Sequence, residues 1–359
     1  MNSVLEAMGL GAEQQAALSE QVKKTPKKVA GRIAQIDADF IAYYVSAESK
    51  AQLDPSDETP RKTIDEVYQA CREFADYIRT MAGAEYAVLH VTTDQTKGGR
   101  DTIAIQREYQ GNRTGREKPE FLSAARKYLG QGLKDTVPGI TGINHTSQEA
   151  DDGLAQAVFH DQDNSVMCSL DKDLRMIPGW RLDMNTFELS NNPDNFGHIE
   201  LDDSKSSKKI VGQGTKFFWA QVLQGDTADN IQGIPAVTGE FWQKVAPTQA
   251  YQKLYDEYIR AEPAKWTDAK EARLQKMLSA TKQCGAVLAY NLIDPCKTDA
   301  ECFNLVRKIY RAYPEKFSHW ETGKEHTPTR VLLSEMQLLW MRRNDDPMDV
   351  LNWIKGGFK

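Results

Sequence analysis

Closely spaced carboxylates are the feature of the sequence that best predicts chemistry. The densest group is Glu149-Ala150-Asp151-Asp152, which lies between Thr146-Ser147 and an apolar run that begins at Leu154. Thr146 followed three residues later by Glu149 is a capping-box pattern, so we expect a helix that starts here with the acids in its first turn. Acids in a first turn also complement the helix dipole, and that explanation would suffice for one such group alone.

Further aspartates follow apolar runs elsewhere in the chain. Asp37, Asp94 and the pair Asp171 and Asp173 follow apolar runs that are typical of strands. The pair Asp226 and Asp229 follows an apolar run that is typical of a helix. So many carboxylates directed at one point would repel each other strongly unless cations lay between them. The pattern therefore favours a metal site over a set of unrelated solvated turns.

The elements that would hold these acids follow a strand, helix, strand order. An apolar run that begins at Val29 reaches Asp37, and apolar residues then recur at helical spacing over 64–81. Two more strand-like runs, 86–91 and 165–170, each end close to an aspartate. This order predicts a parallel α/β sheet, and in such sheets ligands bind beyond the carboxyl ends of the strands.

Composition describes an ordinary globular protein. Of the 359 residues, 40% are hydrophobic and 27% are charged, which suffices for a large core. No run approaches the ~18 apolar residues of a membrane span, and the first residues lack the order of a signal peptide, so we expect a cytoplasmic protein that does not bind membranes. The five cysteines form no CxxC pair, which argues against a structural zinc site and a disulfide framework.

The distribution of charge is more informative than the net charge of -6. Net negative charge argues against a nucleic-acid partner, yet nine acids gathered around metal ions would leave the rest of the chain net positive. Basic side chains crowd the stretch between Asp94 and Glu149, where Tyr109-Gln110-Gly111-Asn112-Arg113 also places an aromatic ring beside an arginine. This mixture suits contact with a single-stranded phosphate backbone and its bases.

The order of these motifs resembles the 5′-nuclease family, which includes flap endonucleases and bacteriophage 5′→3′ exonucleases. The resemblance covers about residues 30 to 240, and the run 171–178 is most similar to the exonucleases of short-tailed lytic phages. The matching pieces are Ile36-Asp37, Asp94, Tyr109-Gln110-Gly111-Asn112-Arg113, Glu149-Ala150-Asp151-Asp152, Ser169-Leu170-Asp171-Lys172-Asp173-Leu174 and Gly225-Asp226-Thr227-Ala228-Asp229-Asn230-Ile231.

The resemblance implies a fold and a domain organisation. A PIN-like parallel central sheet flanked by helices would occupy residues 30–195, after an N-terminal helix and basic linker at 1–29. Residues 95–148 would form a helical arch or clamp over the site. A helix-two-turn-helix segment would occupy 196–245, and a mostly helical C-terminal region 246–359.

The resemblance also implies a site with two Mg²⁺ ions, for which Mn²⁺ would substitute. The first ion would be held by Asp37, Asp94, Glu149 and Asp151, and the second by Asp171, Asp173, Asp226 and Asp229. Asp152 would support the site through water. Two ions roughly 4 Å apart activate a water nucleophile and stabilise the leaving 3′ oxygen of an in-line displacement.

Residues of the arch and of the helix-two-turn-helix would contact DNA. The resemblance implies that Tyr109 stacks on the terminal base and that Arg113 contacts the scissile phosphate. Gln110 departs from the family, which has a lysine there. The expected DNA contacts are Lys97, Arg100, Tyr109, Arg113, Arg116, Lys118, Gly233 and Gly239. The last two glycines would bind the duplex backbone and a monovalent cation, although Ala236 and Thr238 stand where the family has glycines.

The sequence thus predicts a Mg²⁺-dependent 5′→3′ exonuclease or flap endonuclease. Its substrates would be the 5′ ends of duplex DNA, with RNA primers in RNA-DNA hybrids as a second class. We expect a monomer that acts in phage DNA replication, repair or host DNA breakdown. The alternatives are a ribonuclease on the PIN fold, and a non-catalytic DNA-binding protein that keeps the fold.

Overall fold

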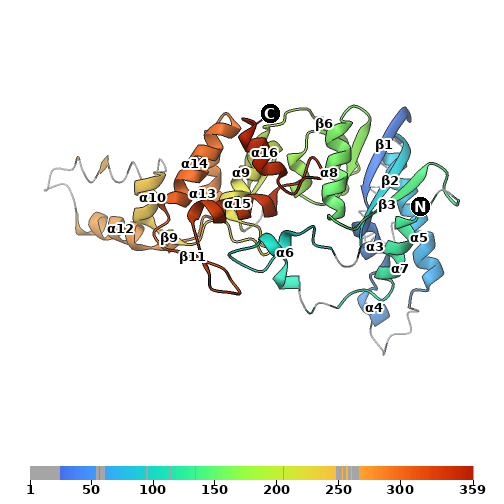
Figure 1. Cartoon of the computed structure of the whole chain (residues 1–359), viewed down its shortest axis with the longest axis horizontal. Coiled ribbons are helices and arrows are strands. Elements are labelled where there is room, and N and C mark those ends of the chain that lie inside the picture. Colours follow the sequence, from blue (N-terminus) through green and yellow to red (C-terminus); the bar gives the residue numbers. More distant parts are fainter. Residues whose placement is uncertain are drawn as a thin grey trace. The chain divides into compact units, whose positions relative to one another are not determined.

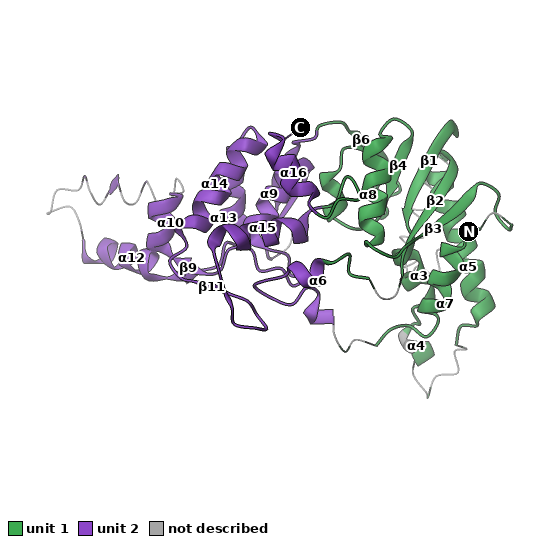
Figure 2. Cartoon of the chain, viewed as in Figure 1, with its two compact units in different colours: residues 1–99, 115–194, 341–347 green, residues 100–114, 195–340, 348–359 purple. Residues whose placement is uncertain are grey.

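The computed structural model divides into two compact units, shown in different colours in Figure 2. Unit 1 is drawn from residues 1–99, 115–194 and 341–347, and unit 2 from residues 100–114, 195–340 and 348–359. The residues described are 25–53, 56, 61–93, 96–113, 115, 117–133, 135–204, 206–247, 253, 256–257, 260 and 267–358. The predicted site residues Asp94 and Arg116, and most of the predicted N-terminal helix and linker, lie outside them.

The division of the chain differs in part from the predicted domains. The units change at residue 194, next to the boundary predicted at 195, and residues on both sides of the boundary predicted at 245 belong to unit 2. The predicted arch, 95–148, contributes residues to both units, and the short segment 341–347 returns to unit 1.

A six-stranded sheet forms the centre of unit 1. Its strand order is β3-β2-β1-β4-β5-β6, and all neighbouring pairs are parallel except β5 and β6. The strands are β1 (Val29–Asp37), β2 (Ala84–Thr92), β3 (Ile140–His145), β4 (Ser165–Cys168), β5 (Gly179–Leu182) and β6 (Leu189–Asn192). The predicted α/β class is confirmed, and this sheet is compatible with a PIN-like core. The alternating pattern of residues 180–189 around Asp183-Met184-Asn185 also predicts a hairpin, and β5 and β6 form it.

Helices cover both faces of this sheet (Figure 1). On one face lie α3 (Ala38–Ser46), α5 (Ile64–Met81) and α7 (Leu122–Gly130), and on the other lies α8 (Ala150–His160). The short α4 (Lys50–Leu53) follows α3, and the 3-10 helix η3 (Asp173–Met176) follows β4. Apolar residues at helical spacing on α5, such as Phe74 and Ile78, are buried in one core with Ile36 and Leu89 of the strands.

The start of α8 differs from the prediction. Glu149 is the N-cap residue, and no side chain of the cap bonds to the backbone of the first turn, so the predicted capping box of Thr146 and Glu149 is wrong. The backbone N–H of Ala150 instead donates to the hydroxyl of Thr92 at the end of β2, at 2.8 Å. A side chain from the sheet thus satisfies one of the N–H groups at the start of α8.

Within its described residues, unit 2 is mostly helical and contains three two-stranded sheets. Its elements are α6 (Arg100–Ile103), η2 (Gly111–Arg113), β7 (His198–Asp202), β8 (Lys209–Gln213), α9 (Gly214–Gln224), β9 (Val237–Thr238), α10 (Gly239–Val245), α12 (Asp268–Ser279), β10 (Thr281–Lys282), α13 (Ala286–Ile293), α14 (Asp299–Ala312), β11 (Phe317–Ser318), β12 (Glu325–His326), α15 (Pro328–Leu339) and α16 (Asp349–Lys355). Trp219, Trp340 and Trp353 are buried and pack ring against ring, so these tryptophans form part of the core of unit 2. No helix within the described ranges is both long and apolar enough to span a membrane.

Candidate metal centre

Asp37 ends the central strand β1 and caps α3. Its carboxylate accepts hydrogen bonds from the backbone N–H of Phe40 at 3.2 Å and from the hydroxyl of Ser169 at 3.0 Å. These two donors fix the carboxylate at the carboxyl end of the strand that lies between β2 and β4. The predicted position of Asp37 at a strand end is therefore confirmed.

The residues after β4 add two more acids in unit 1. The hydroxyl of Ser169 accepts from the backbone N–H of Asp171 at 3.0 Å while it donates to Asp37, so this serine links two predicted ligands. Asp171 in turn accepts from the N–H of Asp173 at 2.8 Å. Asp173 is also paired with Lys172, with 2.8 Å between Nζ and Oδ1. Ser169 was part of a matching motif, but its linking role was not predicted.

The first turn of α8 brings Glu149 and Asp151 to the same group of acids. Because α8 follows β3, both acids lie at the same edge of the sheet as Asp37 and Asp171, and the charges of Asp37, Asp171 and Glu149 raise the pKa of Asp151. The side chain of Asp151 keeps a partly exposed surface, so solvent or an ion can reach it. We call Asp37, Glu149, Asp151 and Asp171 the unit 1 cluster.

Burial and mutual repulsion raise pKa values in the unit 1 cluster. Burial, followed by the charge of Asp39, raises the pKa of Asp37 to about 7. Burial and then the neighbouring carboxylates raise the pKa of Asp151 well above its usual range. A divalent cation between such groups would replace repulsion by attraction, and carboxylate oxygens are the ligands that Mg²⁺ prefers. The donor set of the unit 1 cluster therefore fits Mg²⁺ or Mn²⁺.

Asp39 lies beside the cluster and was not predicted as a site residue. Its Oδ1 lies 3.0 Å from Nε of Arg126 on α7, and its Oδ2 accepts from the backbone N–H of Thr92 at 3.1 Å. Asp39 thus ties α3 to α7 and to the end of β2. The signal was available in the sequence, because Asp37 and Asp39 have the same one-residue spacing as Asp171 and Asp173.

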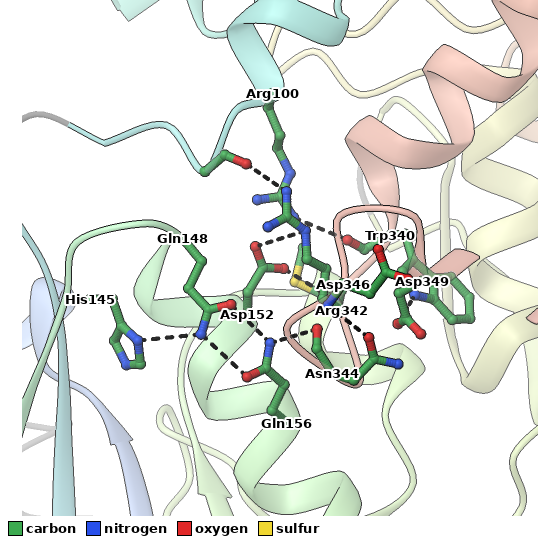
Figure 3. Close-up of polar contacts among 12 residues, drawn as sticks. Arg100, His145, Gln148, Asp152, Gln156, Trp340, Arg342, Asn344, Asp346 and Asp349 are labelled. Atoms are coloured by element: carbon green, nitrogen blue, oxygen red, sulfur yellow. Dashed lines mark hydrogen bonds and ion pairs between the residues drawn. The ribbon is translucent and has the colours of Figure 1, made fainter. Parts of the chain in front are cut away.

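Asp152 has different neighbours from Asp151, although the two are adjacent in α8. Its carboxylate is fully buried and accepts from the backbone N–H of Arg342 at 3.1 Å, and the Arg342 guanidinium lies 3.7 Å away (Figure 3). Gln156, one turn further along α8, donates to the carbonyl of Asn344 at 2.9 Å. Asp152 therefore anchors the segment 341–347 in unit 1, and its water-mediated support of a metal ion stays a prediction.

Hydrogen bonds between uncharged side chains link the strands β1, β2 and β3. His90 on β2 lies 2.9 Å from Oε1 of Gln35 and 3.0 Å from Nε2 of His145 on β3. An amide oxygen only accepts, so Nε2 of His90 carries a proton and its Nδ1 accepts from His145. Burial lowers the pKa of His90 to about 3. These imidazoles therefore supply no positive charge near neutral pH.

Asp226 and Asp229 lie in the loop that follows α9 in unit 2. The backbone groups of Asp226 and Ile231 bond to each other in both directions, at 2.9 and 2.7 Å, and Asp226 also accepts from the N–H of Ala228 at 2.8 Å. Carboxylate oxygens of Asp226 and Asp229 lie within 4.8 Å of each other, close enough to share a cation. The other two ligands predicted for that ion, Asp171 and Asp173, belong to unit 1.

The segment Tyr109–Arg113 of unit 2 contacts this loop. Nη2 of Arg113 lies 2.6 Å from Oδ1 of Asp229, and the side chain of Gln110 donates to the same oxygen at 3.1 Å. Gln110, at the position of the family lysine, therefore bonds to a predicted metal ligand. Tyr109 is only 3% exposed and its hydroxyl accepts from Gln110, so its ring is not available in this structure for the predicted stacking on a base.

The remaining predicted DNA contacts differ in exposure. Arg100 is buried and donates to the carbonyls of Leu338 and Trp340, so its guanidinium serves the end of α15 rather than the surface expected for a DNA contact. Lys118 is exposed and Lys97 is half-buried. Of the two predicted glycines, Gly233 has φ +67° and donates to Glu335 at 2.9 Å, and Gly239 is the first residue of α10.

Comparison with known proteins adds no family assignment. No protein-family model matches the chain, and no curated protein matches it in sequence. The resemblance to the 5′-nucleases therefore depends on the order of short motifs in the sequence.

Proposed function

We propose that the chain is a divalent-metal-dependent nuclease that hydrolyses phosphodiester bonds. The observation that carries this proposal is the unit 1 cluster, in which four carboxylates gather at one edge of a parallel sheet and burial with mutual repulsion raises the pKa of two of them. Ligands bind at this edge in open α/β sheets. A protein with no cation to bind would gain stability by replacing such acids, because each repels the others.

The residues of the cluster would hold the first ion in a defined way. Ser169 and the N–H of Phe40 orient Asp37, and the bond from Ala150 to Thr92 fixes the turn that carries Glu149 and Asp151. When bound, Mg²⁺ supplies a water of lowered pKa and positive charge for the oxygens of the reacting phosphate. The assignment of a second ion to Asp171, Asp173, Asp226 and Asp229 stays a prediction from the sequence.

The finer parts of the proposal come from the resemblance. They are action on the 5′ ends and flaps of duplex DNA, a second activity on RNA-DNA hybrids, and a role in phage DNA replication, repair or host DNA breakdown. The helical arch, the helix-two-turn-helix and its monovalent cation belong to the same proposal. An exposed Arg113 and an exposed Lys118 support contact with phosphates.

One cleavage assay tests the proposal and its polarity. A duplex with a single-stranded 5′ flap, labelled in separate samples at its 5′ and 3′ ends, is incubated with Mg²⁺ or with a chelator. We expect early release of the 5′ label as mono- or short oligonucleotides, gradual shortening of the 3′-labelled strand, and neither reaction with the chelator. Binding of the duplex without any cleavage would instead identify a non-catalytic DNA-binding protein.

Two controls separate the alternatives. The same flap made of RNA tests the PIN-type ribonuclease, which would cut RNA and leave DNA intact. Asp163→Asn, at an exposed acid beyond the end of α8, makes the same chemical change as a cluster variant without touching the cluster, so it should cleave like the wild type.

A further inference from the structure

Two segments of unit 2 that are distant in sequence are bonded along their length. The backbone N–H of Gln110 donates to the carbonyl of Asp229 at 2.9 Å, and the side chain of Asn112 donates to the carbonyl of Thr227 at 2.8 Å. In the opposite direction, Asn230 donates to the carbonyl of Glu108 at 2.9 Å. These three bonds use carbonyl acceptors, so they hold the two segments together whatever is bound to the carboxylate of Asp229.

The carboxylate of Asp229 makes a different kind of contact with the same segment. Its Oδ1 accepts from Gln110, which is neutral, and lies 2.6 Å from the guanidinium of Arg113, which is positive. The loop that carries Asp229 is held in shape by the paired backbone bonds of Asp226 and Ile231, and Asn230 adopts φ +58°. The positive guanidinium of Arg113 therefore lies against a carboxylate oxygen that the sequence predicts as a metal ligand.

The pair of Arg113 and Asp229 is suited to exchange. The side chain of Arg113 is 49% exposed, and ion pairs at such exposure contribute little stability because water screens them. A divalent cation carries twice the charge and binds carboxylate oxygens directly. It can replace the guanidinium on Asp229 while the bonds from the backbone N–H of Gln110 and from the side chain of Asn112 remain in place.

We propose that Arg113 is an internal cation that competes with metal for Asp229, so that metal binding to the loop releases the Arg113 side chain. Arg113 and Gln110 are then positioning residues of the metal ligand. The guanidinium becomes available for an anionic group such as a phosphate only after a cation has taken its place on Asp229. This inference rests on the proposed function only in taking Asp226 and Asp229 as cation ligands.

Metal titration without nucleic acid tests the exchange directly. Mn²⁺ binding is measured by calorimetry on the full chain in an Asp151→Asn background, which weakens the unit 1 cluster. Removal of the competing charge by Arg113→Ala should tighten Mn²⁺ binding roughly two- to five-fold, the range expected from an exposed ion pair. Arg113→Gln, which keeps most of the side chain, should act in the same direction, and Arg113→Lys should stay close to the parent.

Matched variants make the result specific. Arg311→Ala removes an exposed arginine at the end of α14 and should leave Mn²⁺ affinity unchanged. With Asp229→Asn present, Arg113→Ala should no longer tighten binding, because the shared carboxylate is gone. Unchanged or weaker affinity in both Arg113→Ala and Arg113→Gln would overturn the inference, as would an equal effect of Arg311→Ala.

The outcome is independent of the cleavage assay. If Arg113→Ala tightens metal binding but the wild type cuts no nucleic acid, the exchange stands and the proposed function fails. If the wild type cuts DNA and the affinity does not change, the nuclease proposal stands and the exchange is wrong.

Discussion

Asp151 of unit 1 and Asp229 of unit 2 are both predicted metal ligands, yet the charges around them differ in sign. Burial and then the charges of four other carboxylates raise the pKa of Asp151. Asp229 instead lies 2.6 Å from the guanidinium of Arg113. Burial and repulsion thus dominate at Asp151, whereas an arginine of unit 2 itself pairs with Asp229. We therefore expect the stability of unit 1 to depend strongly on a bound metal ion, and we expect Arg113 to compete with metal for Asp229 in unit 2.

The largest expected effect comes from Asp151→Asn. This change removes charge from the unit 1 cluster, so hydrolysis should fall by at least ~10²-fold, the scale for loss of one key electrostatic group in an active site. DNA binding should remain largely intact. Single-turnover cleavage and a gel-shift titration, with Asp163→Asn as the control, measure the two quantities. Cleavage at the wild-type rate would show that the metal assignment is wrong.

The effect of Asp151→Asn on the melting temperature should depend on whether metal is present. In chelator, Asp151→Asn removes repulsion and should raise the melting temperature, while in Mg²⁺ it removes a ligand and should lower the gain that metal gives. A melting temperature that responds to Mg²⁺ equally in both proteins would remove the contrast between the units.

Arg342→Ala should have the next largest effect. Asp152 pairs with the internal cation Arg342, and the pair is buried, with Asp152 at 0% and Arg342 at 5% exposed. Removal of one partner leaves a buried unpaired charge and costs about 3–5 kcal/mol of unfolding free energy. Urea unfolding measures this loss. The double variant Arg342→Ala with Asp152→Asn should recover part of it, and a loss below about 1 kcal/mol would mean that solvent already screens the pair.

Local sequence predicted the acids at the ends of strands well. Asp37 ends a buried apolar run, and Asp171 lies three residues beyond the end of the buried strand β4. The hairpin and α5 also follow from short-range patterns, so the residues near each position determine its structure. The strand β3 was missed because only Ile140 of its six residues is buried, so it shows no apolar run. An edge strand with one covered residue gives little periodic signal.

Contacts between distant residues account for the features that the sequence did not predict. The burial of Arg100 depends on carbonyls more than 200 residues later in the chain, and the partner of Asp152 lies 190 residues away. The hydroxyl that receives the N–H of Ala150 comes from β2, more than 50 residues earlier in the chain. Gln110 looked like a lost phosphate contact, but its acceptor on Asp229 is visible only once the two segments of unit 2 are folded.

Glu335→Gln tests a unit 2 acid that resembles those of unit 1. Glu335 is 1% exposed, and burial raises its pKa to about 7. Because the folded pKa lies above the unfolded one, its contribution to stability is full below pH 4.5 and is lost as the pH rises through 7. Glutamine keeps an acceptor for the N–H of Gly233 and does not titrate. The variant should therefore gain up to about 3 kcal/mol over the wild type between pH 5 and 8.5, and parallel urea-unfolding results at the two pH values would contradict this.

His90 tests whether the imidazole paired with Asp37 in the sheet register is neutral, and its effect should be the smallest. Its folded pKa of about 3 lies below the unfolded value near 6.5, so the stability that it contributes is present above pH 6.5 and is lost as the pH falls toward 3. Relative to His90→Gln, the wild type should lose about 2 kcal/mol between pH 6.5 and 5. Nitrogen-15 chemical shifts should show a neutral ring with the proton on Nε2, as the bond to Gln35 requires. A charged His90 at pH 7 would place a cation beside the acids of unit 1, and the contrast with Arg113 in unit 2 would then disappear.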